Sequence, residues 1–283
     1  MNTQNSAQEI VKQRSIWNLR AWQLLREQRT SRYAVRKIPR MVRGVHIRLP
    51  RSKISVGLRV TSRSEFIAGE NMLPLLYDSR TRGEALSMAL IALDAFEEAS
   101  IGENDFAWFS KLFRLRRSWK MRAIKHSHQL LLSTKEKRAL ADLHSAVALV
   151  ESPSLVHGDL HAGNLIVDFQ NRSLGILDLE LLHIGHPAIN FAQLWIAFFF
   201  ADPRLGGQLY HAYAQSHPWI AKPPSERVIK AEIVLRCYSM IETGNQKPTK
   251  SIMKDKSLQL LKAILSVDSF QQLWSGGNPN DVA

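Results

Sequence analysis

The sequence has almost no cysteine and no long apolar run. Cys237 is the only cysteine among 283 residues, so no disulfide can form within the chain and a reducing compartment is expected. The longest apolar stretch, residues 194–201, is far shorter than the roughly 18 residues that suggest a membrane span. Residues 1–6 are polar and lack the apolar core of a signal peptide. These absences predict a cytoplasmic protein.

Acidic residues are scarce in the first quarter of the chain. Residues 1–64 contain 15 Lys and Arg but only two acidic residues, Glu9 and Glu27, so they account for the whole net charge of +13. Residues 65–283 balance 23 basic side chains against 23 acidic ones. A basic block of this kind attracts phosphate-rich partners such as anionic lipid, nucleic acid or a phosphorylated substrate.

Residues 15–26, within this basic block, set apolar side chains between arginines. Trp17, Leu19 and Trp22 are among the apolar residues, and the composition suits a helix lying on an anionic membrane surface. The alternative is a basic helix packed on its own domain, because an apolar stripe is most often part of a core. An anionic membrane surface, which would make the protein peripheral to the membrane, is therefore one candidate partner of residues 1–64, and nucleic acid is the least favoured partner.

The strongest functional signal is the run His-Gly-Asp-Leu-His-Ala-Gly-Asn at residues 157–164, followed fourteen positions later by Asp178. Phosphoryl transfer from a nucleotide needs a carboxylate that takes or orients the attacking hydroxyl. It also needs an Asn and an Asp that hold magnesium at the phosphates. Asp159, Asn164 and Asp178 supply this set. The step of five residues from Asp159 to Asn164 matches the protein-kinase catalytic loop, and His157 precedes the Asp by two residues, as in that loop.

The pattern resembles the aminoglycoside phosphotransferase and choline kinase family, small-molecule kinases that share the protein-kinase fold and carry a His-Gly-Asp-x-His-x-Gly-Asn loop. The resemblance implies an α+β, bilobal, protein-kinase-like fold with a small, divergent, β-containing N-terminal lobe and a mainly helical C-terminal lobe. It also implies ATP as co-substrate and Mg²⁺ as cofactor. We expect the nucleotide-side lobe at residues 1–77, the catalytic and substrate lobe at residues 78–275 and a frayed tail at residues 276–283.

The resemblance assigns roles to the motif residues. Asp159 would be the base or the orienter of the acceptor hydroxyl. Asn164 and Asp178 would ligate magnesium, a cation that prefers oxygen ligands. His161 falls where many protein kinases have a Lys near the transferred phosphate, whereas His157 would orient the loop backbone.

Two short apolar runs after the loop, residues 165–168 and 174–177, predict a β-hairpin with the five-residue connection 169–173. With the turn centred on Asn171, Asn164 opposes Asp178, and both side chains reach one cation. This interpretation depends on the register, because a slip of one residue would put the two side chains on opposite faces. Glu180 would share the face of Asp178 on a continuing strand. It would then either add a carboxylate to the metal site or remain a solvated charge.

A zinc site is the competing interpretation of the histidines. His157 and His161 are four residues apart, as zinc ligands on a helix are, but the glycines of the motif argue against a helix there. A third ligand would have to come from His183 or His186. Oxygen ligands for magnesium explain more of the fixed positions.

The N-terminal part of the chain departs from the kinase pattern. Kinases place a glycine-rich loop over the phosphates and then a strand Lys that pairs with a helix Glu, yet no glycine precedes Gly44. The run Tyr-Ala-Val-Arg-Lys-Ile at residues 33–38 is the nearest match to the strand sequence Val-Ala-Ile-Lys, which makes Lys37 a candidate for the phosphate-binding lysine. Lys53 is a second candidate, and Glu65 and Glu70 are candidate partners of either lysine.

Further patterns predict the elements around the site. Residues 33–60 alternate β-branched and basic side chains and predict a small sheet, whose last strand would be 72–77. Helices are expected at 83–100, at 111–128 and from about 134 to 150. Residues 195–200 predict a buried core helix, although their aromatic rings could instead cage a cation. The segment 185–190, Gly-His-Pro-Ala-Ile-Asn, resembles a family segment whose Asp braces the catalytic loop, so Asn190 would brace it without a charge.

The sequence therefore predicts a magnesium- and ATP-dependent kinase that transfers the γ-phosphoryl group to a hydroxyl of a small molecule or glycan. The basic residues 1–64 and the charge-balanced residues 65–283 favour a neutral or anionic acceptor. The alternative function is a pseudokinase or scaffold that binds a membrane or another anionic partner through its basic N-terminus. The missing glycines favour this alternative, and the complete set of Asp159, Asn164 and Asp178 opposes it.

Overall fold

The computed structural model describes residues 9–15, 19–56, 59–101, 107–127, 130–146, 153–246 and 251–275. The chain divides into two compact units: unit 1 contains Met1–Glu103 and His157–Leu182, and unit 2 contains Asn104–Val156 and His183–Ala283. The segment with the His-Gly-Asp motif belongs to the N-terminal unit, and the expected lobe boundary after residue 77 stays a prediction. The expected tail, residues 276–283, lies outside the described residues.

Unit 1 contains two sheets. A three-stranded antiparallel sheet has the order β1-β5-β4, and a five-stranded sheet has the order β2-β3-β9-β8-β6. In the second sheet β3 pairs with β9 in parallel, so a strand from the N-terminal segment lies next to the hairpin that follows the motif. The strands are β1 (Glu9–Ser15), β2 (Met41–Val42), β3 (Val45–Arg48), β4 (Ser52–Val56), β5 (Arg59–Glu65), β6 (Glu70–Asn71), β8 (Leu165–Asp168) and β9 (Ser173–Ile176).

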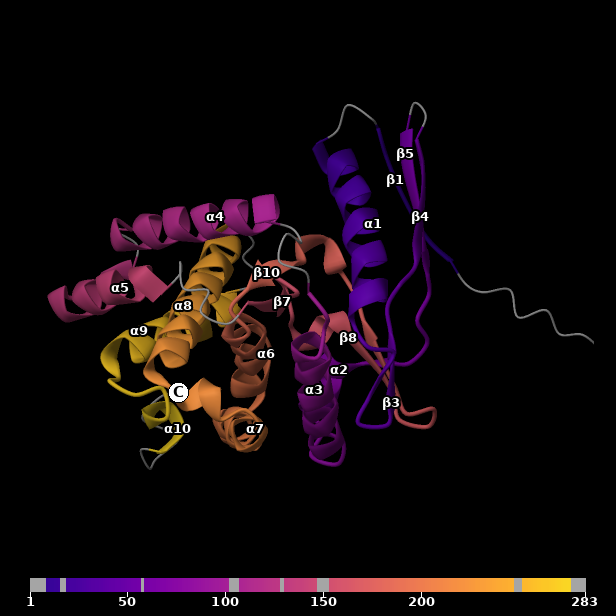
Figure 1. Ribbon diagram of the computed structural model, residues 1–283. Coiled ribbons are helices and arrows are strands. Elements are labelled where there is room, and N and C mark those ends of the chain that lie inside the picture. The colour runs from indigo at the N-terminus through magenta and orange to yellow at the C-terminus, as the bar shows by residue number, and fades with distance from the viewer. Residues whose placement is uncertain are drawn as a thin grey trace, which may run out of the picture. The chain divides into compact units, whose positions relative to one another are not determined.

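Helix α1 (Leu19–Lys37) lies along the three-stranded sheet (Figure 1). Its side chains Leu24, Glu27 and Ala34 are buried, and Leu24 packs against Ile54 of β4. The described part of the helix therefore packs on its own unit; residues 16–18 of the predicted surface helix lie outside the described residues. The expected strand at 33–38 is wrong. Ala34 lies in α1, Ile38 follows its end, and burial of these two residues four positions apart fits a helix.

Two further helices of unit 1 follow β6. The expected strand at 72–77 is wrong, because Met72–Leu75 form helix α2, whose first turn is capped by Asn71: the Leu73 N–H donates to Asn71 Oδ1 at 3.0 Å. A helix at 83–100 was expected, and α3 (Arg82–Glu97) confirms it. Its face is buried as expected, with Phe96 fully inaccessible.

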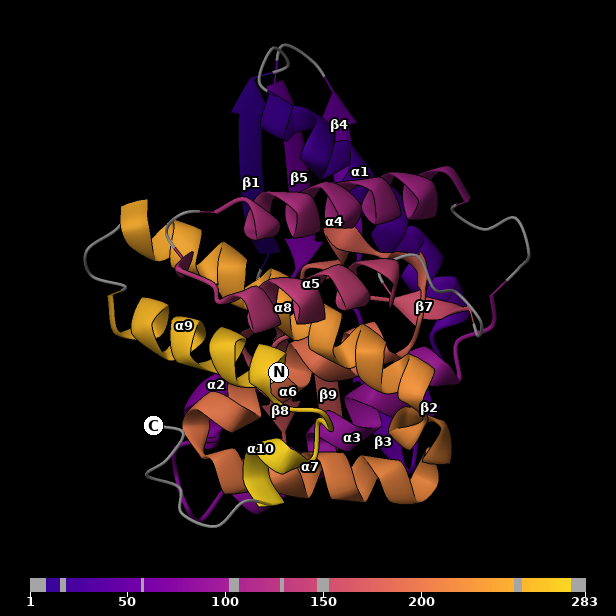
Figure 2. The same cartoon turned by 90° about the vertical axis from the view of Figure 1, so that its left-hand side faces the viewer.

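Unit 2 is mainly helical, and its short strands β7 (Ser154–Val156) and β10 (His183–Gly185) pair with each other. Helices α8 and α9 lie side by side (Figures 1 and 2). The helix start near Ser133 is confirmed by a capping box, in which Glu136 N–H donates to Ser133 Oγ at 3.2 Å and Ser133 N–H donates to Glu136 Oε2 at 2.6 Å. The helices are α4 (Ala107–Lys125), α5 (Thr134–Ala146), α6 (Ala188–Ala201), α7 (Pro203–Ser216), α8 (Pro223–Gln246), α9 (Ser251–Ser266) and α10 (Gln272–Ser275).

The core of unit 2 is centred on α6. Trp195 is fully buried, and its indole N–H donates to the carbonyl oxygen of Gly206 at 3.0 Å. The expected core helix at 195–200 is therefore confirmed. Within the described residues, none of the helices combines the length and the apolar content needed to cross a bilayer.

Candidate functional site

His157 connects the loop of the motif to the end of strand β9. Its ring is fully buried. Its Nε2 lies 2.7 Å from the carbonyl oxygen of Leu177, and its Nδ1 accepts a hydrogen bond from the Asp159 N–H at 3.2 Å. Because a carbonyl only accepts, Nε2 carries the proton and Nδ1 is the acceptor. Both ring nitrogens of His157 are thus engaged by the backbone.

Gly158 gives the loop a turn that other residues do not readily make. Its φ is +86°, in the region that favours glycine. A Cβ at this position would collide with the carbonyl oxygen of Leu181, the last residue of the short 3₁₀ helix η3 (Leu179–Leu181). The close approach of the Gly158 and Leu181 backbones fixes the path of the chain that leads to Asp159.

The carboxylate of Asp159 is accessible. Its side chain is 29% exposed, and the Nε2 of His161 lies 3.9 Å from its Oδ2. The Nδ1 of His161 accepts from the Gly163 N–H at 3.0 Å and caps the 3₁₀ turn η2 (Ala162–Asn164). This bond orients the His161 ring, with Nε2 facing the carboxylate.

Asn164 has its amide nitrogen engaged by the loop. The Nδ2 group donates to the backbone carbonyl oxygen of Asp159 at 2.9 Å, which leaves the amide oxygen as the acceptor of that side chain. From β6, the Nδ2 of Asn71 donates to the carbonyl oxygen of Gly163 at 2.7 Å. The loop is therefore tied both to itself and to the neighbouring strand.

The hairpin register differs from the expected one by one residue. Leu165 pairs with Ile176 and Asp168 with Ser173, so the connection is the four residues 169–172. The cause lies in the turn, where Asp168 accepts hydrogen bonds from the backbone and side-chain nitrogens of Asn171 at 3.0 and 2.7 Å. These bonds close a tighter turn and bring Ser173 into the strand.

Consequently, Asn164 does not lie opposite Asp178. The N–H of Leu177 donates to the carbonyl oxygen of Asn164 at 2.9 Å, so Leu177 occupies that place. Asp178 then leaves strand geometry, with φ 60° and ψ 50°, a conformation uncommon outside glycine. Because the backbone turns here, strand alternation no longer decides which way the Asp178 side chain points. The same turn invalidates the expectation that Glu180, which lies in η3, shares a strand face with Asp178.

The donors of this segment fit magnesium better than zinc. Asp159, Asn164 and Asp178 offer oxygen atoms, the ligands that magnesium prefers. His157 has both nitrogens engaged, and His183 and His186 lie in unit 2, where the Nδ1 of His186 accepts from the Ala188 N–H at 3.2 Å. Among the residues that the structure describes, no three His, Cys, Asp or Glu side chains form a group that could hold a metal ion.

The two lysines proposed from the sequence lie on different elements. Lys37 is the last residue of α1, so it is not a strand lysine, and its Nζ lies 5.6 Å from the centre of the Tyr33 ring. Lys53 is exposed on β4, where it pairs with Arg63. Its neighbour Ile54 packs against α1, and adjacent strand residues point to opposite faces. Lys53 therefore lies on the face turned away from α1.

Sequence reasoning missed a third lysine, Lys12 on β1. Lys12 pairs with Ser62, and Ser62 pairs with Ile54. Ile54 is the residue that packs against Leu24 of α1, and Glu27, one turn after Leu24, is buried. Lys12, on strand β1, and Glu27, on the helix that follows it, are fifteen residues apart, and the run Ile-Val-Lys that starts at residue 10 contains the lysine.

Asn190 occupies the place of the bracing Asp. It is buried, and its Nδ2 donates to the carbonyl oxygen of Leu155 at 2.9 Å. Leu155 lies on β7, two residues before His157. The amide therefore holds the strand that leads into the loop by an uncharged hydrogen bond.

The sequence pattern of the family described as "Phosphotransferase enzyme family" matches residues 13–223. No curated protein matches the chain. Among solved structures, a thermostable mutant of aminoglycoside phosphotransferase APH(4)-Ia, in a ternary complex with AMP-PNP and hygromycin B, is similar with a TM-score of 0.62 and 16% identity, covering 92% of this chain and 87% of that one.

Two other solved structures are similar. Aminoglycoside phosphotransferase APH(3'')-Id from Streptomyces rimosus, in complex with ADP and streptomycin, has a TM-score of 0.55 and 16% identity over 79% of this chain and 85% of that one. The GDP complex of aminoglycoside 2'-phosphotransferase-IIIa has a TM-score of 0.52 and 14% identity over 86% and 83%. At these identities the likeness shows the fold, and it confirms the expected protein-kinase-like α+β class.

Proposed function

This chain belongs to the phosphotransferase enzyme family, and we propose that it is a magnesium-dependent kinase that transfers the γ-phosphoryl group of ATP to a hydroxyl of a small molecule or glycan. One observation carries the proposal: hydrogen bonds join the segments that contain Asp159, Asn164 and Asp178 into one network, called the frame below. His157 and Asn164 each bind both the Asp159 backbone and the Leu177 backbone. Because Asp178 follows Leu177 directly, the frame supports a site that combines a loop carboxylate with two oxygen ligands.

Asp159 has the role of base or orienter in this proposal. Its carboxylate is partly exposed, whereas its backbone N–H and carbonyl are both used by the frame. The side chain is therefore available to accept a hydrogen bond from an acceptor hydroxyl while the backbone stays fixed, which is what positioning of a nucleophile requires. His161, with Nε2 on the same side, would donate to the transferred phosphoryl group.

Asn164 and Asp178 would hold magnesium, which neutralises phosphate charge when bound. The Asn164 amide nitrogen is occupied, so its oxygen is the atom left for a cation. Glu180, on η3, stays a candidate for a further carboxylate.

We also propose Lys12 as the phosphate-binding lysine and Glu27 as its partner, in place of Lys37 and Lys53. The support is the backbone register, which puts Lys12 in the same cross-strand row as Ile54, the residue next to α1. Glu27 is buried on that helix, and a buried acid requires a compensating charge or hydrogen bonds.

The acceptor is proposed as a neutral or anionic compound with a free hydroxyl. The solved relatives hold hygromycin B or streptomycin, which supports a small-molecule acceptor in general. The balanced charge of residues 65–283 gives no electrostatic preference for a cation.

The experiment that tests the function uses purified full-length chain, labelled ATP and a panel of metabolites and glycans, with and without Mg²⁺. We expect transfer to at least one hydroxyl compound, and a loss of about 100-fold or more in kcat in the Asp159→Asn variant. Asp178→Ala should abolish transfer. The matched control is Asp168→Asn, which removes a carboxylate from the turn of the same hairpin and should leave transfer unchanged at pH 7.

Transfer that persists in both Asp159→Asn and Asp178→Ala would contradict the proposal. Nucleotide binding without transfer to any compound or to water would support the pseudokinase alternative instead, for which the sequence without glycine before Gly44 is the favouring observation. Thermal shift with ATP measures the binding separately, because a ligand at a hundred times its Kd stabilises the fold by about 2.7 kcal/mol.

A further inference from the structure

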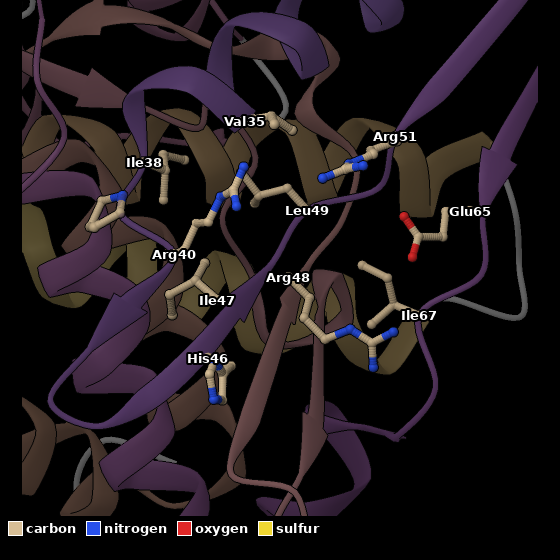
Figure 3. Close-up of a pocket in the computed structure, with 11 residues that line it drawn as sticks. Val35, Ile38, Arg40, His46, Ile47, Arg48, Leu49, Arg51, Glu65 and Ile67 are labelled. Atoms are coloured by element: carbon tan, nitrogen blue, oxygen red, sulfur yellow. The ribbon is translucent and has the colours of Figure 1, made fainter.

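A cavity in unit 1 lies outside the motif segments. It has a volume of about 480 Å³, within the range of roughly 300 to 1,000 Å³ that is typical of small-molecule sites. The end of α1, strand β3, the segment after it and the residues around the end of β5 line it (Figure 3). The lining residues are Val35, Ile38, Pro39, Arg40, His46, Ile47, Arg48, Leu49, Arg51, Glu65 and Ile67.

The cavity carries an excess of positive charge. Arg40, Arg48 and Arg51 line it against a single acid, Glu65. In Figure 3, Arg40 and Arg51 come from opposite sides of the cavity and Arg48 extends toward Ile67. Three guanidinium groups and one carboxylate leave a net charge of two positive units in one small space, which favours an anion.

The three guanidinium groups are not neutralised by other parts of the described chain. The structure gives none of them a side-chain hydrogen bond or ion pair within the described residues. The exposed Asp168 attracts Arg48 and offsets part of its charge; the pKa of Asp168 is lowered chiefly by hydrogen bonds from Asn171 and to a lesser degree by Arg48. The charges are therefore available to a ligand.

The backbones that carry these arginines are fixed. The carbonyl of Arg40 accepts from the Ile47 N–H at 2.9 Å, and the carbonyl of Arg51 accepts from the Glu65 N–H at 3.1 Å. Arg48 is paired with Gly175 of β9. A site with a fixed backbone loses less conformational entropy when it binds a ligand, which favours affinity.

The cavity is distinct from the motif site. None of its lining residues belongs to the loop 157–164 or to the segment 177–180. Strand β3 runs parallel to β9, and Arg48 pairs with Gly175, two residues before Leu177, so the cavity is near the motif segments but is lined by other residues. A ligand here would thus be additional to the nucleotide and the acceptor.

We propose that this cavity is a second, non-catalytic binding site for a soluble phosphorylated small molecule. Guanidinium groups bind phosphate oxygens through paired hydrogen bonds, and three arginines line this cavity. The apolar side chains of Val35, Ile38, Ile47, Leu49 and Ile67 give the non-phosphate part of the ligand a surface to pack on. A phosphate site here would account for part of the positive charge of residues 1–64.

The test is calorimetric titration of the full chain with inorganic pyrophosphate, at constant ionic strength and without Mg²⁺. The Asp178→Ala background is used so that the motif site contributes as little as possible and failure of the kinase proposal does not affect the result. We expect saturable binding that weakens by about tenfold or more in the triple variant R40Q/R48Q/R51Q, because charge-assisted contacts are lost.

Two variants make the test specific. The matched control R29Q/R32Q/R36Q removes three exposed arginines of α1 that do not line the cavity, and it should bind pyrophosphate as the parent does. E65Q removes the one acid of the cavity and should tighten binding about two- to threefold, a gain that a merely damaged fold would not give.

Equal weakening in R40Q/R48Q/R51Q and in R29Q/R32Q/R36Q would overturn the proposal, because it would indicate general attraction by net charge. Absence of saturable binding in the parent would also overturn it. So would binding to vesicles of anionic lipid that depends on the three arginines while pyrophosphate does not bind, since the surface would then serve a membrane.

Discussion

The Nε2 of His157 lies 2.7 Å from the carbonyl oxygen of Leu177, and through this contact one buried ring joins two segments separated by twenty residues. The same ring accepts from the Asp159 N–H. The ring therefore contacts the backbone of the proposed base, Asp159, and the residue before the proposed metal ligand, Asp178. We expect His157 to be a positioning residue.

His157→Phe keeps a ring of similar size and removes both hydrogen bonds. We expect the free energy of unfolding to fall by about 1 to 3 kcal/mol, because the buried groups of Leu177 and Asp159 lose their partner. We expect kcat to fall more than the KM for ATP changes, since the base is displaced. Urea unfolding and steady-state kinetics measure the two effects. An unchanged free energy of unfolding would show that the hydrogen bonds of His157 do not contribute to stability.

Gly158→Ala should be strongly destabilising, by about 2 to 4 kcal/mol, because positive φ and a collision with Leu181 act together. Gly83→Ala is the control. Gly83 lies in α3 with open space around it, so alanine there should stabilise the protein by up to about 1 kcal/mol. Thermal unfolding compares the two variants. A Gly158→Ala variant as stable as the parent would mean that the loop can adopt another path.

Lys12→Ala should lower kcat/KM for ATP by about 100-fold or more, as expected for the loss of a phosphate contact at a charged centre. Lys53→Ala, on β4, and Lys37→Ala, at the end of α1, should stay within about threefold of the parent. The three variants remove the same charge. If Lys53→Ala or Lys37→Ala were the most damaging, the assignment from the register would be wrong.

Glu232 of α8 is the centre of a buried polar network in unit 2. Its Oε2 lies 2.7 Å from Nη2 of Arg117, and both side chains are nearly inaccessible. Burial alone would raise the pKa of Glu232, but Arg117 and Arg236 outweigh burial and hold it below the ordinary value.

Glu232→Leu should therefore cost about 3 to 5 kcal/mol, because it leaves the Arg117 guanidinium buried without its acid. The double variant Arg117→Met/Glu232→Leu should recover a large part of this loss, because no uncompensated charge remains. Chemical unfolding of the single and double variants measures the difference. A double variant less stable than Glu232→Leu would contradict this account.

Asp168 gives stability that depends on pH. Hydrogen bonds from the side chain and then the backbone of Asn171 lower the pKa of Asp168 in the folded protein. A carboxyl whose folded pKa is lowered stabilises the fold above its unfolded pKa, about 4, and loses that contribution as the pH falls through the folded value. Asp168→Asn should therefore be less stable than the parent at pH 7. The difference should shrink below about pH 4, as urea unfolding at several pH values can show.

The sequence predicted the family and the central elements better than the N-terminal elements. The family could be predicted because phosphoryl transfer limits both residue type and spacing in the loop, whereas the roles of the loop residues stay a prediction. The core helix around Trp195 could be predicted because its apolar run is dense. The hairpin was predicted in kind but displaced by one residue. The displacement arises from the hydrogen bonds between Asp168 and Asn171. These bonds favour a four-residue connection over a five-residue one, and the composition of the turn alone does not distinguish the two.

The N-terminal unit was predicted poorly for a physical reason. Residues 33–38 carry β-branched and basic side chains that fit a strand, and only the packing of Ala34 and Ile38 on the unit determines a helix. The same misassignment placed the candidate lysines, Lys37 and Lys53, at or after the end of α1, whereas the proposed Lys12 lies before that helix. The cavity with Arg40, Arg48 and Arg51 could not be foreseen, since its lining depends on backbone hydrogen bonds from Ile47 to Arg40 and from Glu65 to Arg51.

The parallel pairing of β3 with β9 sets an order for biosynthesis. Strands β3 and β6 leave the ribosome about a hundred residues before β9 and β8, the strands that they flank. Until residue 176 has been synthesised, unit 1 lacks the middle of its larger sheet, and the strands made earlier expose unpaired edges of the kind that recruit other chains. Premature termination after unit 1's first segment would consequently yield an aggregation-prone fragment, and nascent chains of that length are where we expect chaperones to act.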